Sequence, residues 1–128
     1  MSYNYDVIHN DKFTSELTEV LCEVPEQRQF NAPHHFRVRD VHSKQIVSMV
    51  DFQEGPTKEH GLNGLFIPDL LLMCITQLES FQNSDFKCIE NSEALHHLYD
   101  AVDWLRRRTE SRRGQGVLGT NKKREEYK

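Results

Sequence analysis

The chain has 128 residues, 37% of them apolar, which suits one small domain with a modest core. Its 20 acidic residues outnumber 16 basic ones, and the net charge of -4 excludes a protein that coats nucleic acid through bulk positive charge. The three cysteines form no C-x-x-C pair and the longest apolar run, Leu70 to Ile75, is far shorter than the ~20 residues that span a bilayer, so the sequence predicts a soluble intracellular protein.

The first 33 residues fit two kinds of secondary structure. One set of apolar positions has the spacing of an amphipathic helix, and a second set, rich in β-branched residues, suits a strand. The two sets are Phe13, Leu17, Val20 and Leu21, and Thr14, Leu17, Thr18 and Val20. Residues 1–33 are therefore interpreted as an N-terminal extension of uncertain structure.

Two strands are predicted next. Residues 36–41 alternate apolar and charged side chains, residues 46–52 are rich in β-branched and aromatic ones, and a short polar turn separates them. This pattern predicts an antiparallel β-hairpin. Because an isolated hairpin is marginally stable in water, it must pack on helices or pair with strands of another copy.

A first helix is predicted from Pro68 to Gln82, after a glycine-containing loop over residues 53–64. Proline is favoured at a first helical position, and Asp69 adds negative charge to the first turn. Leucine, isoleucine and phenylalanine then recur at helical spacing up to Phe81.

A second, longer helix is predicted from Cys88 to Arg113, followed by glycines that end it. One stripe is apolar in the middle and polar at its ends, and consists of Cys88, Asn91, Leu95, Leu98, Val102, Leu105, Thr109 and Arg112. The short connection between the helices predicts an antiparallel helical hairpin, and the polar ends of the stripe indicate groups held for a polar partner.

The arginines near the end of this helix allow two interpretations. Cations are favoured at a helix C-terminus by typically 0.3–1 kcal/mol each, and Asp103 and Glu110 are within reach for ion pairs. Arg108 and Arg112, however, are four residues apart and share one face, an arrangement suited to phosphate oxygens.

Phe81 and Asn91 also have two interpretations each. Phe81 can close the core between the helices or offer a face on which a base stacks. Asn91 can bond its own backbone or read the edge of a base or a ribose.

Other motifs are set aside. The segment Gly114–Gly119 matches G-x-G-x-x-G, but it follows a helix, whereas a dinucleotide fingerprint follows a strand. Neither of the histidine pairs, at 34–35 and 96–97, makes a one-face metal site. We therefore predict no metal, no cofactor and, in the absence of a recognisable catalytic motif, no enzyme.

From about Phe36 to Asn121 the chain resembles the bacteriophage Thoeris anti-defence proteins, which share a helical-hairpin domain with the anti-CBASS nucleotide sponges. The likeness lies in D-F-Q-E-G-P-T-K-E-H-G-L-N-G at 51–64, L-E-S-F-Q at 78–82, F-K-C-I-E-N at 86–91 and D-W-L-R-R-R-T-E-S-R-R-G-Q-G-V-L-G-T-N at 103–121. Two positions depart from the family pattern: Ile89 stands where arginine is common, and Leu118 where glutamate is usual. These departures bear on the choice of ligand.

The resemblance implies an α+β fold, an antiparallel β-hairpin followed by a two-helix antiparallel hairpin, in a homo-oligomer. The sponge domain would span residues 34–121, with a charged tail at 122–128. Such proteins act in the cytoplasm of the bacterial host, form dimers and in some members hexamers, and enclose cyclic nucleotide messengers without cleaving them. The ligands are chiefly glycocyclic ADP-ribose isomers and in some members cyclic di- or trinucleotides.

By position, the family's ligand-contacting residues fall on Phe81, Asn91, Arg108 and Arg112, and the loop that includes Gly119 and Thr120 would close over the ligand. No membrane and no nucleic-acid polymer is expected as a partner. The alternative from the residues alone is a nucleic-acid-binding or purely structural oligomeric helical hairpin that uses its arginine-rich end on a phosphate backbone.

Overall fold

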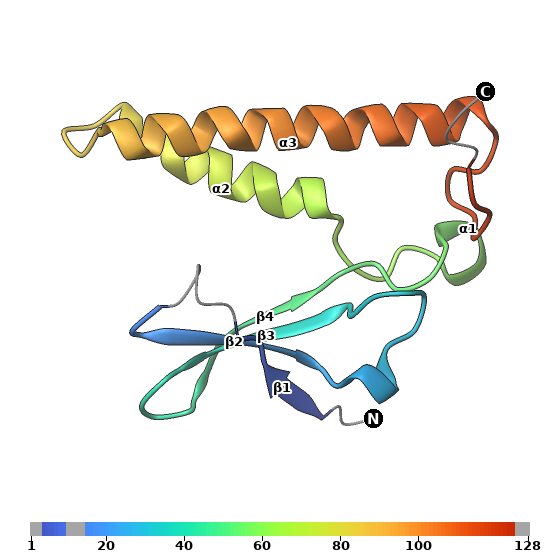
Figure 1. Cartoon of the computed structure of the whole chain (residues 1–128), viewed down its shortest axis with the longest axis horizontal. Coiled ribbons are helices and arrows are strands. Elements are labelled where there is room, and N and C mark those ends of the chain that lie inside the picture. The colour runs from blue at the N-terminus through green and yellow to red at the C-terminus, as the bar shows by residue number, and fades with distance from the viewer. Residues whose placement is uncertain (1–3, 10–14, 125–128) are drawn as a thin grey trace. The chain divides into compact units, whose positions relative to one another are not determined.

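The computed structural model describes residues 4–9 and 15–124, in two compact units, Met1–Leu65 and Phe66–Lys128. The first unit is a sheet and the second is a pair of helices (Figure 1). This architecture confirms the predicted α+β fold with a β-hairpin followed by a helical hairpin. The sheet is larger than predicted, because it has four strands and not two.

The sheet is antiparallel, with strand order β1-β2-β3-β4 (Figure 1). The strands are β1 (Tyr5–Val7), β2 (Thr18–Glu23), β3 (His35–Asp40) and β4 (Ile46–Asp51), and a 3₁₀ helix, η2 (Pro25–Gln27), follows β2. The predicted hairpin corresponds to β3 and β4.

The two additional strands come from the segment whose structure the sequence left open. Thr18–Glu23 is a strand, and its last three residues are buried. The alternative interpretation, a helix over these residues, is therefore wrong. Phe13 and Thr14, which entered that interpretation, lie outside the described residues.

The connection after β4 is held by side chains, although the sequence predicted only a loop. It includes a single helical turn, α1 (Thr57–His60). The Asn63 amide donates to the Glu54 carbonyl at 2.8 Å, and its oxygen accepts the Glu54 N–H at 2.8 Å. Phe52 and Leu65 form a β-bridge, and a Cβ at Gly64 would lie 2.5 Å from the Phe52 carbonyl carbon. Glycine is therefore required at position 64.

The second unit is the helical hairpin of α2 (Ile67–Gln82) and α3 (Ile89–Gly114). Both helices begin within one residue of their predicted starts. The Asp69 carboxylate accepts the Phe66 N–H at 2.8 Å at the start of α2, and Cys88 Sγ accepts the Asn91 N–H at 3.4 Å at the start of α3. Ile75 and Leu95 are the buried side chains of the two helices.

The two helices differ in length, and this difference leaves one end of α3 without a neighbouring helix. With 16 residues against 26, α2 is shorter by about 15 Å at 1.5 Å per residue. Figure 1 shows α2 alongside the first part of α3 only. The C-terminal arginines therefore lie on the part of α3 that extends past α2.

In the described ranges, no helix combines the length and the apolar character that crossing a membrane requires.

Candidate functional site

The structure divides the predicted ligand-binding residues between the two ends of the helical hairpin. One end holds Arg108, Arg112, Gly119 and Thr120, and the other holds Phe81 and Asn91. Asn91 and Arg112 are 21 residues apart on one continuous helix, about 30 Å at 1.5 Å per residue. A single small nucleotide cannot touch both ends of one chain.

Arg112 holds the segment that follows α3. Its Nη2 donates to the Val117 carbonyl at 3.0 Å and to the Thr120 carbonyl at 3.1 Å, and the Thr120 hydroxyl also donates to the Val117 carbonyl. The chain turns back at Gly116 and Gly119, whose φ values are 72° and 75°. A positive φ favours glycine, so these residues allow the backbone to curl around the guanidinium.

The Arg112 guanidinium keeps capacity for a ligand. A guanidinium has five N–H donors, and the two bonds to the loop use only Nη2. Within the described part of the chain, Nε and Nη1 make no hydrogen bond. Burial, and after it the charges of Arg108 and Arg124, lower the pKa of Arg112, yet an arginine remains protonated at neutral pH.

Arg108 lies one helical turn before Arg112 and is exposed. It makes no hydrogen bond and no ion pair with any residue that the structure describes. Two positive side chains on one face, neither of which forms an ion pair with a described carboxylate, produce a local positive potential that attracts anions.

The neighbouring arginines form ion pairs with acidic residues of the same helix, Asp103 and, at 3.6 Å from Arg106, Glu110. Arg106 contacts Asp103 at 2.6 Å, and Arg107 contacts the same carboxylate group at 2.9 Å. Arg107 also lies over the Trp104 ring, 4.6 Å from its centroid. The hydrogen bond from Arg106 lowers the pKa of Asp103, which keeps this carboxylate ionised. Ion pairs within the helix therefore account for Arg106 and Arg107, whereas Arg108 and Arg112 make no ion pair among the described residues.

Phe81 and Asn91 lie at the opposite end of the helical hairpin, where each could contact a ligand. Phe81 is 42% exposed in the last turn of α2, so it closes the core only in part. Asn91 is half-buried in the first turn of α3, and its side-chain amide makes no hydrogen bond within the described residues. The interpretation in which the Asn91 side chain bonds its own backbone is therefore wrong.

Gln82 fixes this end of the hairpin, and sequence reasoning missed it. Its side-chain amide donates to the Cys88 carbonyl at 3.0 Å, and its oxygen accepts the Cys88 N–H at 2.9 Å. These two bonds close the connection between α2 and α3 and hold Phe81 near the start of α3. A glutamine at a helix end carries no sequence signal for such a role.

Comparison with known proteins finds similarity over the helical hairpin and over most of the chain. A family model for the hairpin domain of Acb2/Tad1 proteins matches residues 44–110, which include all of α2 and most of α3. Over 129 aligned residues the chain is 40% identical to Thoeris anti-defense 1 of Bacillus phage SBSphiJ7, and the match covers 83% of this chain and 91% of that protein.

Proposed function

This chain belongs to the Acb2/Tad1 hairpin family, and from that premise we propose that it is a Thoeris anti-defence protein that sequesters a cyclic nucleotide messenger without cleaving it. The ligands proposed are glycocyclic ADP-ribose isomers and, as a second class, cyclic di- or trinucleotides. Binding the messenger would remove it from the host effector that it activates.

One observation carries the proposal: among the described residues, Arg108 and Arg112 keep guanidinium donors without a partner on one face, beside a glycine-containing loop. Guanidinium groups bind phosphate oxygens with charge-assisted, often bidentate hydrogen bonds. We propose that these two residues bind the phosphates and that Gly119 and Thr120 line the same pocket.

Phe81 and Asn91 complete the proposed site as the part that recognises the base. The exposed face of Phe81 would stack an adenine, and the unbonded Asn91 amide would bind a base or ribose edge. Since the two ends of one hairpin are about 30 Å apart, we propose that a second copy, running antiparallel, brings its Phe81 and Asn91 beside the arginines of the first.

Exposed apolar side chains on both helices support such self-association. Leu72 and Met73 on α2 and Tyr99 and Trp104 on α3 are all exposed. A unit with so few buried side chains gains stability by covering these residues. A dimer is the simplest assembly that does so.

The decisive test of sequestration is recovery of the ligand. The protein is incubated with glycocyclic ADP-ribose, filtered to remove free ligand and denatured by heat. We expect the released compound to have an unchanged mass and retention time. A chemically altered product would show that the protein is an enzyme.

The alternative, binding of a nucleic-acid polymer through the arginine-rich end, predicts a different result. Affinity for an oligonucleotide would fall steeply between low and moderate salt. Sequestration instead requires a Kd well below the messenger concentration, and nanomolar binding corresponds to about -12 kcal/mol. Titrating both ligands in the same buffers distinguishes the two functions.

We predict that Phe81→Ala weakens binding of glycocyclic ADP-ribose about 5- to 150-fold, because stacking of a base on an aromatic ring contributes roughly 1–3 kcal/mol. Isothermal titration calorimetry measures the change. Phe86→Ala is the matched control, since Phe86 is a more exposed phenylalanine in the neighbouring connection. Equal losses for the two variants would contradict a specific role for Phe81.

A further inference from the structure

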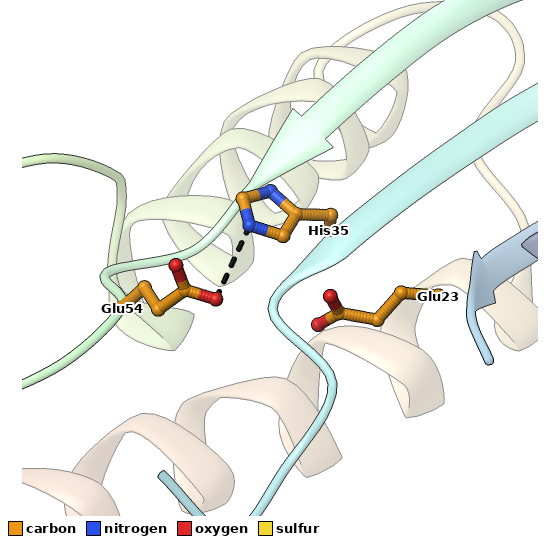
Figure 2. Close-up of side chains that lie close together, drawn as sticks. All are labelled: Glu23, His35 and Glu54. Atoms are coloured by element: carbon orange, nitrogen blue, oxygen red, sulfur yellow. Dashed lines mark ion pairs between the residues drawn. The ribbon is translucent and has the colours of Figure 1, made fainter. Parts of the chain in front are cut away.

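Three side chains that can bind a metal converge in the first unit, and none of them belongs to the proposed nucleotide site. Glu23, His35 and Glu54 each direct one ligand atom into a space in which these atoms lie within 4.8 Å of one another. Figure 2 shows the carboxylates of Glu23 and Glu54 turned toward the His35 ring from opposite sides.

The sheet topology explains why these residues meet. Cys22 is opposite Phe36, so Glu23 and His35 lie one step further along the same two strands. His35 is in turn opposite Asp51 at the end of β4. Glu54 follows that strand, and the hydrogen bonds of its backbone to the Asn63 amide hold it there. The end of β2, the start of β3 and the end of β4 therefore lie next to one another at the same end of the sheet.

Glu23 is the unusual member of the cluster, since it is a 0% exposed carboxylate. Its Oε1 accepts the His34 N–H at 2.7 Å, whereas Oε2 is buried and has no hydrogen-bond partner among the described residues. Burial of a carboxylate is costly unless the charge is paired or binds a metal. No lysine or arginine pairs with the Glu23 or Glu54 carboxylate in the described ranges.

His35 is oriented by a second carboxylate, as metal-binding histidines usually are. Its Nδ1 lies 2.9 Å from Asp51 Oδ1, and Asp51 also accepts a hydrogen bond from Arg37 at 3.1 Å. This contact turns Nε2 toward Glu54, whose Oε2 is 3.3 Å away. Arg37 pairs with Asp51, so among the described residues the His35 ring is the partner of Glu54, and no cation pairs with Glu23.

From this geometry we propose that Glu23, His35 and Glu54 bind one Zn²⁺ ion, which fixes the ends of three strands. One imidazole nitrogen and two carboxylate oxygens form a donor set suited to zinc, with water in the fourth position. Ligand atoms at ~2.1 Å in a tetrahedral zinc site are about 3.4 Å apart, close to the spacing between His35 and Glu54. Glu54 is 25% exposed, which gives the ion a route from solvent.

The test uses the full-length chain without a histidine tag, dialysed against a chelator and then into metal-free buffer. Calorimetric titration with Zn²⁺ is expected to give one ion per chain, and the Tm should rise once Zn²⁺ exceeds its Kd. Co²⁺ should give the strong visible absorption of a four-coordinate ion. A chain that binds neither ion and keeps the same Tm would overturn the proposal.

Two variants locate the site. Glu23→Gln and Glu54→Gln should each weaken Zn²⁺ binding at least about tenfold, since even the loss of an outer hydrogen-bond partner of a ligand typically costs about 10- to 100-fold. Glu54 is partly exposed, so its variant should fold even if the buried Glu23→Gln does not. His42→Gln, which changes an exposed histidine in the turn after β3, should bind like the wild type. Undiminished binding by Glu54→Gln would place any bound zinc elsewhere and overturn the assignment.

Discussion

Replacing both Arg108 and Arg112 with alanine is expected to weaken binding of glycocyclic ADP-ribose about 10²- to 10⁴-fold. Each lost charge-assisted hydrogen-bond partner accounts for roughly 1.5–3 kcal/mol. The measurement is isothermal titration calorimetry at constant salt. Arg108→Ala alone should cost about 10- to 150-fold and leave the Tm unchanged, because Arg108 has no hydrogen bond or ion pair within the described chain.

The matched control is the double variant Arg106→Ala/Arg107→Ala. This variant also removes two positive charges from the C-terminal part of α3, but both of these arginines already form an ion pair with Asp103. We expect affinity within a few-fold of the wild type. If the two double variants lose equal affinity, net charge and not a specific phosphate site explains binding, and the proposed roles of Arg108 and Arg112 are wrong.

Leu95→Ala is expected to lower the free energy of unfolding by about 2–5 kcal/mol, the usual cost of removing a buried leucine side chain. Leu95 is 7% exposed and is the buried side chain of α3. Urea unfolding followed by circular dichroism at 222 nm measures the loss, because nearly all helix of the described chain is in α2 and α3.

Leu62→Ala provides the same substitution at a 76% exposed position. Surface substitutions of this kind usually change stability by less than about 0.5 kcal/mol. Equal destabilisation by the two variants would mean that Leu95 does not hold the helical hairpin together.

The helices could be predicted from the sequence almost to the residue. Apolar residues recur at regular helical spacing in both helices. Pro68 and Asp69 indicate the start of α2, and Gly114 indicates the end of α3. The predicted stripe from Cys88 to Arg112 is half-buried or buried except at Cys88, which is exposed. These signals are local, so no knowledge of distant contacts was needed.

The first half of the sheet could not be predicted in the same way. Leu21, Cys22 and Glu23 are consecutive buried residues, which breaks the alternation that indicates a strand. Their burial depends on pairing with β1 and β3, a long-range contact. For the same reason the Glu23–His35–Glu54 cluster could not be predicted: its three residues come from three segments, and only one residue of the His34–His35 pair takes part.

The placement of the residues proposed for the nucleotide site could be predicted in part from the sequence. Spacing placed Arg108 and Arg112 on one face, yet only the contacts of Asp103 separate them from Arg106 and Arg107. The positions of Phe81 and Asn91 at the far end of the hairpin follow from the helix length, whereas the Gln82 contact that holds that end depends on side-chain geometry across the connection.

The hydrogen bonds of Arg112 bear on how long the proposed ligand would remain bound. Within the chain itself, the guanidinium already holds the backbone at Val117 and Thr120. A phosphate at the remaining donors would therefore meet a preorganised loop, and association would not need to order that backbone. Affinity differences between related complexes arise mostly in the dissociation rate. We therefore expect the residence time of the nucleotide to depend on the contacts between Arg112 and this loop.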